Sequence, residues 1–306
     1  MIDFNVLEKM VRGSVNLNVM MKDYTSMCVG GPCVCLFTPE DKDDLLKFID
    51  WARSNSQRYL VIGAGTNILV KDGGIKLPLI RIKDTLDSIE VENQDDVSVT
   101  LKVGAGKPLA GIVKYCADNG FTGIEPLAGI PGTLGGAIYM NAGTGKETIS
   151  DVIEAVTFIE RTGKIKTFEK DDMGFGYRKC SALSTSTIVT SAVIKLGRSS
   201  TVKVQKRVEE IVKNKAQIQP LNYPSAGSIF KNLKKKKAWE MLDEAGMRGV
   251  RVRNAKYSEL HTNFIINTGG ATATDVLALI DAGMEKVKEK TGLKLELEVI
   301  IVGEDQ

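Results

Sequence analysis

Histidine is almost absent from this chain, since His261 is the single histidine among 306 residues. A metal site built from histidines, or a charge-relay set that needs a histidine base, is therefore excluded. The five cysteines are odd in number and lack the spacing of a zinc site, so we expect reduced, buried thiols and no metal. Any chemistry must then come from carboxylates, arginine, serine or a bound cofactor.

Long apolar runs are missing too, because no stretch approaches the roughly 20 residues of a membrane-spanning helix. The N-terminus carries acidic residues where a signal peptide would be basic, so we expect a cytoplasmic protein without a membrane partner. A net charge of +3 is too small to indicate nucleic-acid binding. The length of 306 residues, with 43% hydrophobic content, predicts two or three domains around a sizeable core.

Glycine, by contrast, is concentrated between Gly120 and Gly143. The densest part surrounds Ile130 and Pro131, where the backbone could wrap closely around a flat or anionic ligand. Pro131 suits the first turn of a helix, whose free N–H groups and positive end would favour an anion. A glycine-rich turn without a ligand explains this stretch, taken alone, equally well.

A second glycine-rich loop, GAGTN at 63–67, follows a predicted buried strand at 59–62. Ile68 stands where a dinucleotide-binding G-x-G-x-x-G motif needs its third glycine, which argues against a Rossmann fold. A phosphate-binding loop of another kind stays open. The GTGKET stretch at 143–148 lacks the first glycine and the Ser or Thr of a P-loop, and we set it aside.

The remaining pattern predicts α+β subdomains, because strands and helices follow one another without a regular βαβ repeat. Alternation predicts a strand at 97–103, and Thr162-Gly163 joins a hairpin of 152–160 and 164–170. Helices are expected from Asp41, over 109–119, over 202–215, and from Thr272 or Thr274. The SAGS segment at 225–228 is interpreted as flexible, and further strands are predicted at 261–267 and 293–299.

Four blocks together resemble the UDP-N-acetylenolpyruvoylglucosamine reductase family of flavoenzymes. They are VGGP at 29–32, GAGTNILV at 63–70, LAGIPGTLGGAIYMNAG at 127–143 and PSAGSIFKN at 224–232. FGYR at 175–178, HTNFIIN at 261–267 and LELEV at 295–299 follow in the family's order. The first three blocks also resemble the wider FAD-binding superfamily of vanillyl-alcohol oxidase and p-cresol methylhydroxylase.

The resemblance implies an α+β fold in which a two-subdomain FAD-binding platform of that superfamily type precedes a C-terminal α+β substrate-binding domain. The expected boundaries are 1–82, 83–198 and 199–306. FAD is implied as the bound cofactor and NADPH as the hydride donor. The implied small-molecule substrate is UDP-N-acetylglucosamine enolpyruvate, reduced to UDP-N-acetylmuramate for peptidoglycan synthesis, and a monomer is expected.

The resemblance also carries over site residues, position by position. It implies Ser228 as proton donor, Arg178 as the cation near the substrate carboxylate and Glu298 as the acid that assists enolate formation. Substrate contacts are expected from Tyr177, Lys231, Asn232 and His261, although a structural hydrogen-bonding role explains His261 equally well. The residues expected to bind FAD are Gly30, Gly63, Ala64, Gly65, Thr66, Asn67, Ile68, Gly129, Ile130, Pro131, Gly132, Thr133, Gly135, Gly136, Asn141, Ala142 and Gly143.

The chain departs from the family pattern in places. Cys180 stands where a serine is usual, Leu233 replaces a proline, and Arg253-Asn254 occupy a place often held by glycines. The segment after Asn141 lacks a tyrosine-bearing loop, which suggests the shorter family type. The basic run at 234–237 is interpreted as a solvated surface. An oxygen-using oxidase of the wider superfamily and a catalytically silent FAD- or nucleotide-sugar-binding regulator are the alternative functions.

Overall fold

The computed structural model describes residues 4–305, so the first three residues of the N-terminal segment lie outside it. The chain forms two compact units, each assembled from separate segments. Unit 1 comprises residues 1–17, 35–64 and 77–214, and unit 2 comprises residues 18–34, 65–76 and 215–306. Helix α5 (Thr201–Ile218) carries the chain from the first unit into the second. The boundaries 1–82, 83–198 and 199–306 stay a prediction. None of the helices within residues 4–305 is long and apolar enough to cross a membrane.

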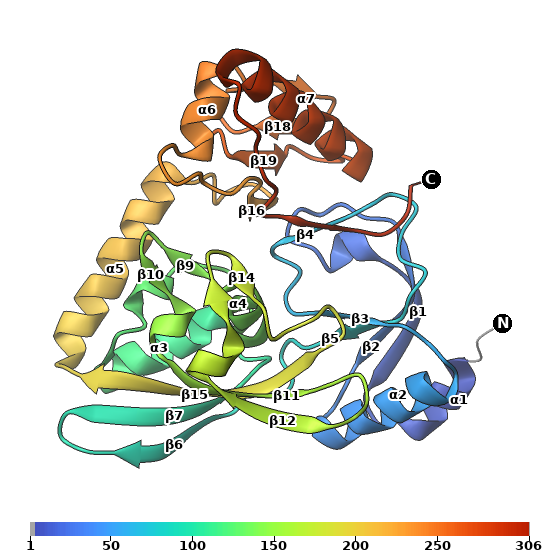
Figure 1. The fold of residues 1–306 in the computed structure, drawn as a ribbon, viewed down its shortest axis with the longest axis vertical. Coiled ribbons are helices and arrows are strands. Elements are labelled where there is room, and N and C mark those ends of the chain that lie inside the picture. Colours follow the sequence, from blue (N-terminus) through green and yellow to red (C-terminus); the bar gives the residue numbers. More distant parts are fainter. Residues whose placement is uncertain (1–3, 306) are drawn as a thin grey trace. The chain divides into compact units, whose positions relative to one another are not determined.

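The larger sheet of unit 1 has the strand order β12-β11-β15-β7-β6, and all its pairs are antiparallel (Figure 1). Its strands are β6 (Ile89–Gln94), β7 (Ser98–Gly104), β11 (Ile153–Ile159), β12 (Ile165–Glu169) and β15 (Ile188–Arg198), and β8 (Phe121–Thr122) pairs with β15. The predicted alternation in β7 is confirmed for Val99, Leu101 and Val103, which are fully buried, but Val97 precedes the strand and is exposed. Helices α3 (Leu109–Asn119) and α4 (Leu134–Met140) lie over one face of this sheet (Figure 1).

Unit 1 also contains a parallel arrangement in which β5 (Leu79–Arg81) lies between β2 (Pro32–Thr38) and β3 (Leu60–Ile62). Strand β1 (Ser14–Met20) follows α1 (Phe4–Met10) and lies at the edge, beside β2. The helix between β2 and β3 is α2 (Lys42–Ser54), which begins where predicted because the Asp41 side chain accepts from the Asp44 N–H at 3.0 Å. Its Phe48 ring stacks on Phe37 at 5.1 Å, which attaches the helix to β2.

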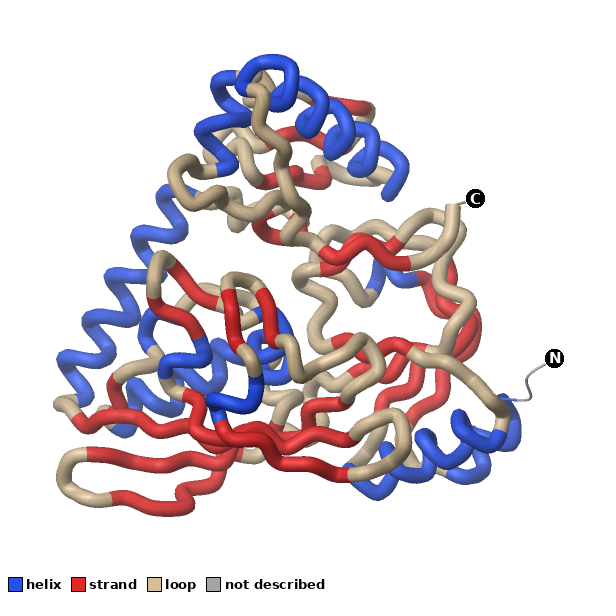
Figure 2. The backbone as a smooth tube through the Cα atoms, viewed as in Figure 1, coloured by secondary structure: helices blue, strands red, loops and turns tan. Residues whose placement is uncertain are grey.

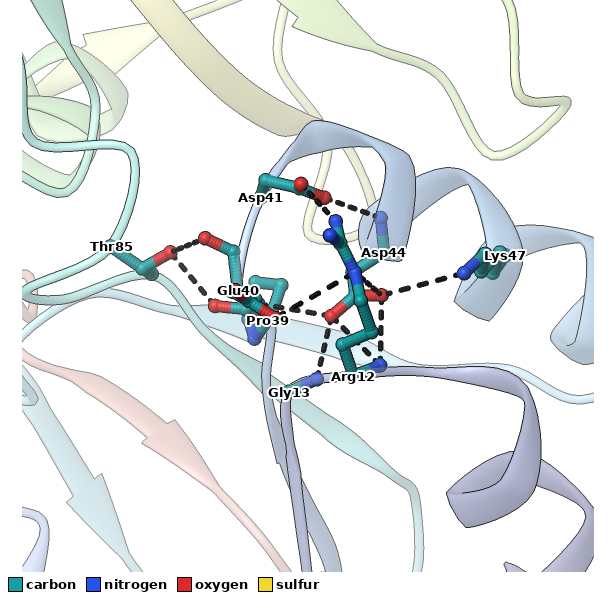
Figure 3. A network of polar contacts seen from close by, with 8 residues as sticks. All are labelled: Arg12, Gly13, Pro39, Glu40, Asp41, Asp44, Lys47 and Thr85. Atoms are coloured by element: carbon teal, nitrogen blue, oxygen red, sulfur yellow. Dashed lines mark hydrogen bonds and ion pairs between the residues drawn. The ribbon is translucent and has the colours of Figure 1, made fainter.

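The start of α2 is fixed by the carboxylate of Asp44, which is fully buried (Figure 3). It accepts hydrogen bonds from the backbone N–H groups of Arg12 at 3.0 Å, Gly13 at 2.6 Å and Glu40 at 3.1 Å. Burial alone would raise the pKa of Asp44, but these three N–H groups and the Arg12 charge outweigh it and hold the pKa below its usual value. The carboxylate thereby joins the end of the N-terminal segment to the turn after β2.

Unit 2 is built on a four-stranded antiparallel sheet of order β16-β19-β18-β17. Its strands are β16 (Ser225–Ser228), β17 (Arg251–Val252), β18 (Ala255–Tyr257) and β19 (Phe264–Asn267). Helices α6 (Ala238–Glu244) and α7 (Ala273–Thr291) pack on it (Figure 1). The core of this unit also takes in Met27, Val29 and Leu69 from the other two segments. Strand β4 (Ile68–Val70) pairs in parallel with β20 (Ile300–Val302) near the end of the chain.

Three expectations for unit 2 are wrong. Residues 225–228 form a strand rather than a flexible turn, and the strand predicted from His261 begins only at Phe264. The segment 293–299 is irregular, apart from one bridge between Leu297 and Phe230, and the strand follows it at β20 (Figure 2). Leu295 and Val299 are nevertheless buried, whereas Leu293 is 39% exposed. Alternation thus predicted part of the packing of this segment but not its hydrogen bonding.

Candidate functional site

The two predicted cofactor loops of unit 1 meet at Gly63 and Thr133. A Cβ built on Gly63 would lie 2.4 Å from Thr133 Oγ1, so the contact requires glycine. The Thr133 hydroxyl in turn accepts from the N–H of Gly136 and caps α4. Gly129 and Gly132 have φ angles of 74° and 130°, which side chains rarely adopt. The loops therefore lie side by side with backbone shapes that only glycine accepts readily.

Two details of the second loop differ from expectation. Pro131 is not in the first turn of a helix, because α4 begins at Leu134 and Thr133 is its N-cap. The N–H of Gly135 donates to Ala105 O at 2.8 Å, and a Cβ there would lie 3.2 Å from Ala105 Cβ. Gly135 thus serves the packing of α4 and has no N–H to offer a ligand. Gly136 is exposed, and a Cβ on it would meet only Thr133 Oγ1 within 4 Å.

Arg178 occupies the turn between β13 (Phe175–Gly176) and β14 (Lys179–Cys180), with a φ of 52° that is uncommon outside glycine. Its Nη2 donates to Gly143 O at 3.1 Å, and its guanidinium carbon lies 5.1 Å from the centre of the Tyr177 ring. The Asn141 side chain, at the C-cap of α4, donates to Gly176 O at 3.0 Å. Asn141 and Gly143, expected to contact the cofactor, thus hold the hairpin that carries Arg178. Gly143 begins β9 (Gly143–Thr144), which pairs with β10 (Glu147–Thr148).

Cys180 replaces the serine usual in this hairpin, and its thiol is occupied inside the fold. Cys180 Sγ lies 3.3 Å from Met173 O, and its burial raises the pKa of the thiol. The side chain is 5% exposed, so this sulfur is not a nucleophile presented at the surface.

In unit 2, Ser228 and Glu298 lie on neighbouring backbone segments. Ser228 ends β16, where it pairs with Phe264 of β19. The N–H of Glu298 donates to the carbonyl of Ile229, the next residue after Ser228, at 2.8 Å. Both residues are partly exposed. The structure therefore brings together two residues, far apart in the sequence, that the resemblance assigns to proton transfer.

The unit 2 part of the GAGTN loop is tied to the same segment. Asn67 Nδ2 donates to Glu298 O at 3.1 Å, and the N–H of Ile300 donates to Asn67 O at 3.0 Å. Gly65 has a φ of 67°, and a Cβ on it would lie 2.1 Å from Tyr24 O. This loop, like that of unit 1, has a shape that requires glycine.

Gly30 lies in the same unit and packs against β4. Its φ of 129° and a distance of 2.8 Å from an added Cβ to Val70 Cβ both exclude a side chain there. Gly30 therefore supports the strand that follows the cofactor loop.

The residues after β16 organise the start of α6. Asn232 Oδ1 accepts from the N–H of Ala238 at 2.9 Å, and the N–H of Lys231 donates to Glu296 O at 2.8 Å. In the basic run that follows, Lys236 forms an ion pair with Glu244, an arrangement typical of a solvated surface.

His261 precedes β19, and its ring lies edge-on to Phe264 at 4.9 Å. Among residues 4–305, its Nδ1 is the one buried side-chain nitrogen or oxygen atom without a hydrogen-bond partner. Burial lowers the pKa of His261, so the ring is neutral at pH 7. Nothing in the described residues supports a hydrogen-bonding role for Nδ1 inside the protein, and a bound molecule or water would satisfy it.

Two sequence-family models match the chain, an FAD binding domain over residues 34–169 and the C-terminal domain of UDP-N-acetylenolpyruvoylglucosamine reductase over residues 219–302. A UDP-N-acetylenolpyruvoylglucosamine reductase from Clostridium tetani is 35% identical and is aligned over 99% of this chain and 96% of its own length. The one from Geobacter metallireducens is 38% identical over 96% of each chain. The crystal structure of the reductase from Thermus caldophilus has a TM-score of 0.80 and 35% identity, covering 95% of this chain and 98% of that one.

The chain belongs to the UDP-N-acetylenolpyruvoylglucosamine reductase family. The predicted fold class, an FAD-binding platform followed by a C-terminal α+β domain, is confirmed, as is the class of FAD-containing oxidoreductase. The glycine loops of this reductase family member fit such a cofactor, because Gly65, Gly129 and Gly132 have positive φ angles, at which successive backbone N–H groups can form an anion-binding concavity. Residues 4–305 contain no cluster of three or more histidine, cysteine, aspartate or glutamate side chains that could hold a metal.

Two residues that support the site of this reductase family member escaped the sequence analysis. Asn263, buried within HTNFIIN, donates to Phe230 O at 2.8 Å and accepts from the N–H of Phe230 at 3.0 Å. Its side-chain amide thus makes the two hydrogen bonds that a neighbouring strand would make to the residue shortly after β16. Asp72 accepts from the N–H groups of Ala273 and Thr274 at the start of α7. The motif HTNFIIN includes Asn263 as a polar residue, but no sequence pattern shows which distant backbone group its side chain binds.

Proposed function

We propose that this chain catalyses the NADPH-dependent, FAD-mediated reduction of UDP-N-acetylglucosamine enolpyruvate to UDP-N-acetylmuramate, a step in peptidoglycan precursor synthesis. The observation that carries this proposal is the adjacency of Ser228 and Glu298 in unit 2, through the bond from Glu298 N–H to Ile229 O at 2.8 Å. An FAD-binding platform is common to many oxidoreductases, whereas this pair lies in the C-terminal domain that the reductase family adds.

When bound, FAD would supply the hydride chemistry, taking a hydride from NADPH and delivering it to the enolpyruvyl double bond. Backbone N–H groups of 63–68, together with those of Gly129, Gly132 and Thr133, would hold its diphosphate. Gly135, Gly136 and Ile130 are left out of this set because their N–H groups already bind Ala105 O, Thr133 Oγ1 and Leu127 O. Pro131 has no N–H group.

Residues of this chain would complete the reduction by stabilising negative charge on the substrate and supplying one proton. Arg178, a permanent planar cation, would bind the substrate carboxylate, and its bond to Gly143 O reduces the freedom that it loses on binding. Ser228 would give its hydroxyl proton to the carbon next to that carboxylate. Serine is a poor acid, so this transfer needs a strongly basic carbanion and a stabilising neighbour, a role that we assign to Glu298.

We further propose that Tyr177, Lys231, Asn232 and His261 contact the nucleotide sugar. Tyr177 is 50% exposed beside Arg178, and His261 offers the ring nitrogen described above. Function as a cytoplasmic monomer belongs to the same proposal. All five cysteines are free thiols, as is usual in a reducing compartment.

The test is a visible absorption spectrum of the full-length protein after reconstitution with FAD. We expect a yellow protein that NADPH bleaches anaerobically and that the enolpyruvyl nucleotide sugar then reoxidises. A flavin that NADPH does not bleach, but that oxygen rapidly reoxidises after chemical reduction with dithionite, would indicate the oxidase alternative. Bound flavin without turnover would indicate the regulator. A protein that takes up no flavin would refute the proposal.

A further inference from the structure

We propose that Asn67 is a positioning residue for Glu298. Its side-chain amide holds the backbone of Glu298, so that the loop assigned to the cofactor also fixes the carboxyl group assigned to proton transfer. This inference rests on the proposed function for the role of Glu298.

The contact is a pair of hydrogen bonds around one peptide segment. Asn67 Nδ2 donates to Glu298 O at 3.1 Å, and Asn67 O accepts from the N–H of Ile300 at 3.0 Å. The parallel pairing of β4 with β20 begins at the next residue, where Ile68 is in register with Ile300. Asn67 thus extends this pairing by one side chain beyond the end of the strands.

The segment that carries Glu298 is held along 229–231, because the Lys231 N–H donates to Glu296 O, Leu297 bridges Phe230 and the Val299 N–H donates to Ile229 O. Asn67 holds it from the GAGTN loop. Residues 293–299 form no strand, and the N–H of Glu298 is held by Ile229 O while its carbonyl is held by Asn67. One main-chain group of Glu298 is therefore tied to the residue after Ser228, and the other is tied to the GAGTN loop. Removing the Asn67 amide would release the second tie and let the carboxyl group move relative to Ser228.

The same observation changes the expected role of Asn67 in cofactor binding. Glycine-rich loops bind a diphosphate through backbone N–H groups, and this side-chain amide already donates a hydrogen bond to Glu298. The loop shape is set by Gly65 and by the bond from the Ser26 N–H to Gly65 O at 3.1 Å, which an alanine at position 67 leaves in place. FAD binding should therefore survive the loss of the side chain.

The experiment compares Asn67→Ala with the wild-type holoenzyme. We expect full FAD content and bleaching by NADPH within about threefold of wild type. Flavin reoxidation by the enolpyruvyl substrate should slow by roughly 100-fold, the typical effect of a misplacement of about 1 Å. Amide hydrogen exchange at 296–302 should become faster. Asn93→Ala, which removes an exposed asparagine of β6, is the matched control and should change none of these quantities.

A double-mutant cycle with Glu298→Ala decides whether Asn67 acts through Glu298. If it does, Asn67→Ala should add less than about threefold to the defect of Glu298→Ala, because contacting residues are not additive. Full additivity, loss of FAD, equal slowing of both half-reactions, or unchanged hydrogen exchange at 296–302 would each overturn the inference. The hydrogen-exchange arm needs no substrate, so a wild-type protein that failed to turn over would refute the proposed function while the positioning contact was still tested.

Discussion

Ser228 ends a strand whose register is held from both neighbouring segments, by β19 through Phe264 and by Glu298 through Ile229. Removal of its hydroxyl should therefore leave the fold intact and affect chemistry alone. In Ser228→Ala we expect NADPH to bleach the flavin at nearly the wild-type rate. Substrate should reoxidise the reduced flavin about 10²–10⁴ times more slowly, since this is the usual contribution of a positioned proton donor. Anaerobic stopped-flow absorbance separates the two halves.

The control is Ser228→Cys, whose thiol can also donate a proton and should recover part of the lost rate. Slowing of both halves to the same extent in Ser228→Ala would mean that the serine serves the flavin or the fold rather than the proton.

Gly63 lets the loop at 63–67 approach Thr133 more closely than any residue with a Cβ would allow. In Gly63→Ala the new Cβ would lie 2.4 Å from Thr133 Oγ1, and we expect overpacking to cost about 1–3 kcal/mol and to weaken FAD retention. Thr133→Ala alone should cost about 1 kcal/mol through loss of the α4 N-cap. Thermal unfolding and flavin content measure both effects.

The two changes should compensate each other, because Thr133→Ala removes the atom that the new Cβ would strike. The double variant is expected to be more stable than the sum of the single losses and to regain FAD. If the losses simply add, the close approach of the two loops does not limit this site.

At the scale of single elements, local signals predicted helix ends better than strand pairing. Asp41 at the start of α2 and Thr272 at the start of α7 cap through their own side chains, which the local sequence shows. The irregular segment 293–299 alternates like a strand, yet its polar backbone groups bind individual residues such as Ile229 and Asn67. Alternation reports which side chains are buried and contains no information about the hydrogen-bonding partner.

In the candidate site too, some features could be predicted from the sequence and others are determined only by the folded structure. Glycine loops and reactive side chains could be assigned from motifs, because the resemblance specifies residue types at given positions. The residues that hold them could not, since Asn141 binds Gly176 and Asn263 binds Phe230 through contacts that form only when distant segments fold together. In both cases an asparagine side chain replaces a backbone partner.

The start of α2 gives a prediction about acid stability. The pKa of Asp44 is lowered in the folded protein, so its network contributes stability that is fully present above the unfolded-state value of about 3.9 and is lost as the pH falls through the lower folded-state value. Asp44→Asn should be less stable at pH 7 by roughly 1–3 kcal/mol, because a buried amide N–H group would face backbone donors.

Urea unfolding at pH 7 and at pH 3 measures this difference. The gap between wild type and Asp44→Asn should shrink at the lower pH, and Asp50→Asn, on the exposed side of α2, should show no such gap. An equal gap at both pH values would mean that Asp44 is not charged in the folded state at pH 7.

For the molecule as a whole, the composition of unit 2 from three segments predicts that the C-terminal region does not fold alone. The core contains Met27, Val29 and Leu69, all at most 2% exposed, and each contributes about 1.5–3 kcal/mol through burial. A fragment of residues 215–306 would lack these side chains and would leave β20 without β4.

We expect this fragment to give a proton NMR spectrum with poor chemical-shift dispersion and to be cleaved rapidly by proteases. The full chain is the control and should resist proteolysis across 215–306. A well-dispersed spectrum from the fragment would instead support a substrate-binding domain that is independent from residue 199 onward, as the sequence predicts.

The pairing of β4 with β20 also determines how late in synthesis the fold of unit 2 can be completed. Ribosomes add about 5–20 residues per second, so the nascent chain would wait roughly 10–50 s between emergence of Ile68 and emergence of its partner Ile300. During that interval Leu69, fully buried in the finished protein, has no native neighbours from the last segment. Segments 18–34 and 65–76 are therefore the parts of the growing polypeptide on which we expect chaperones to act.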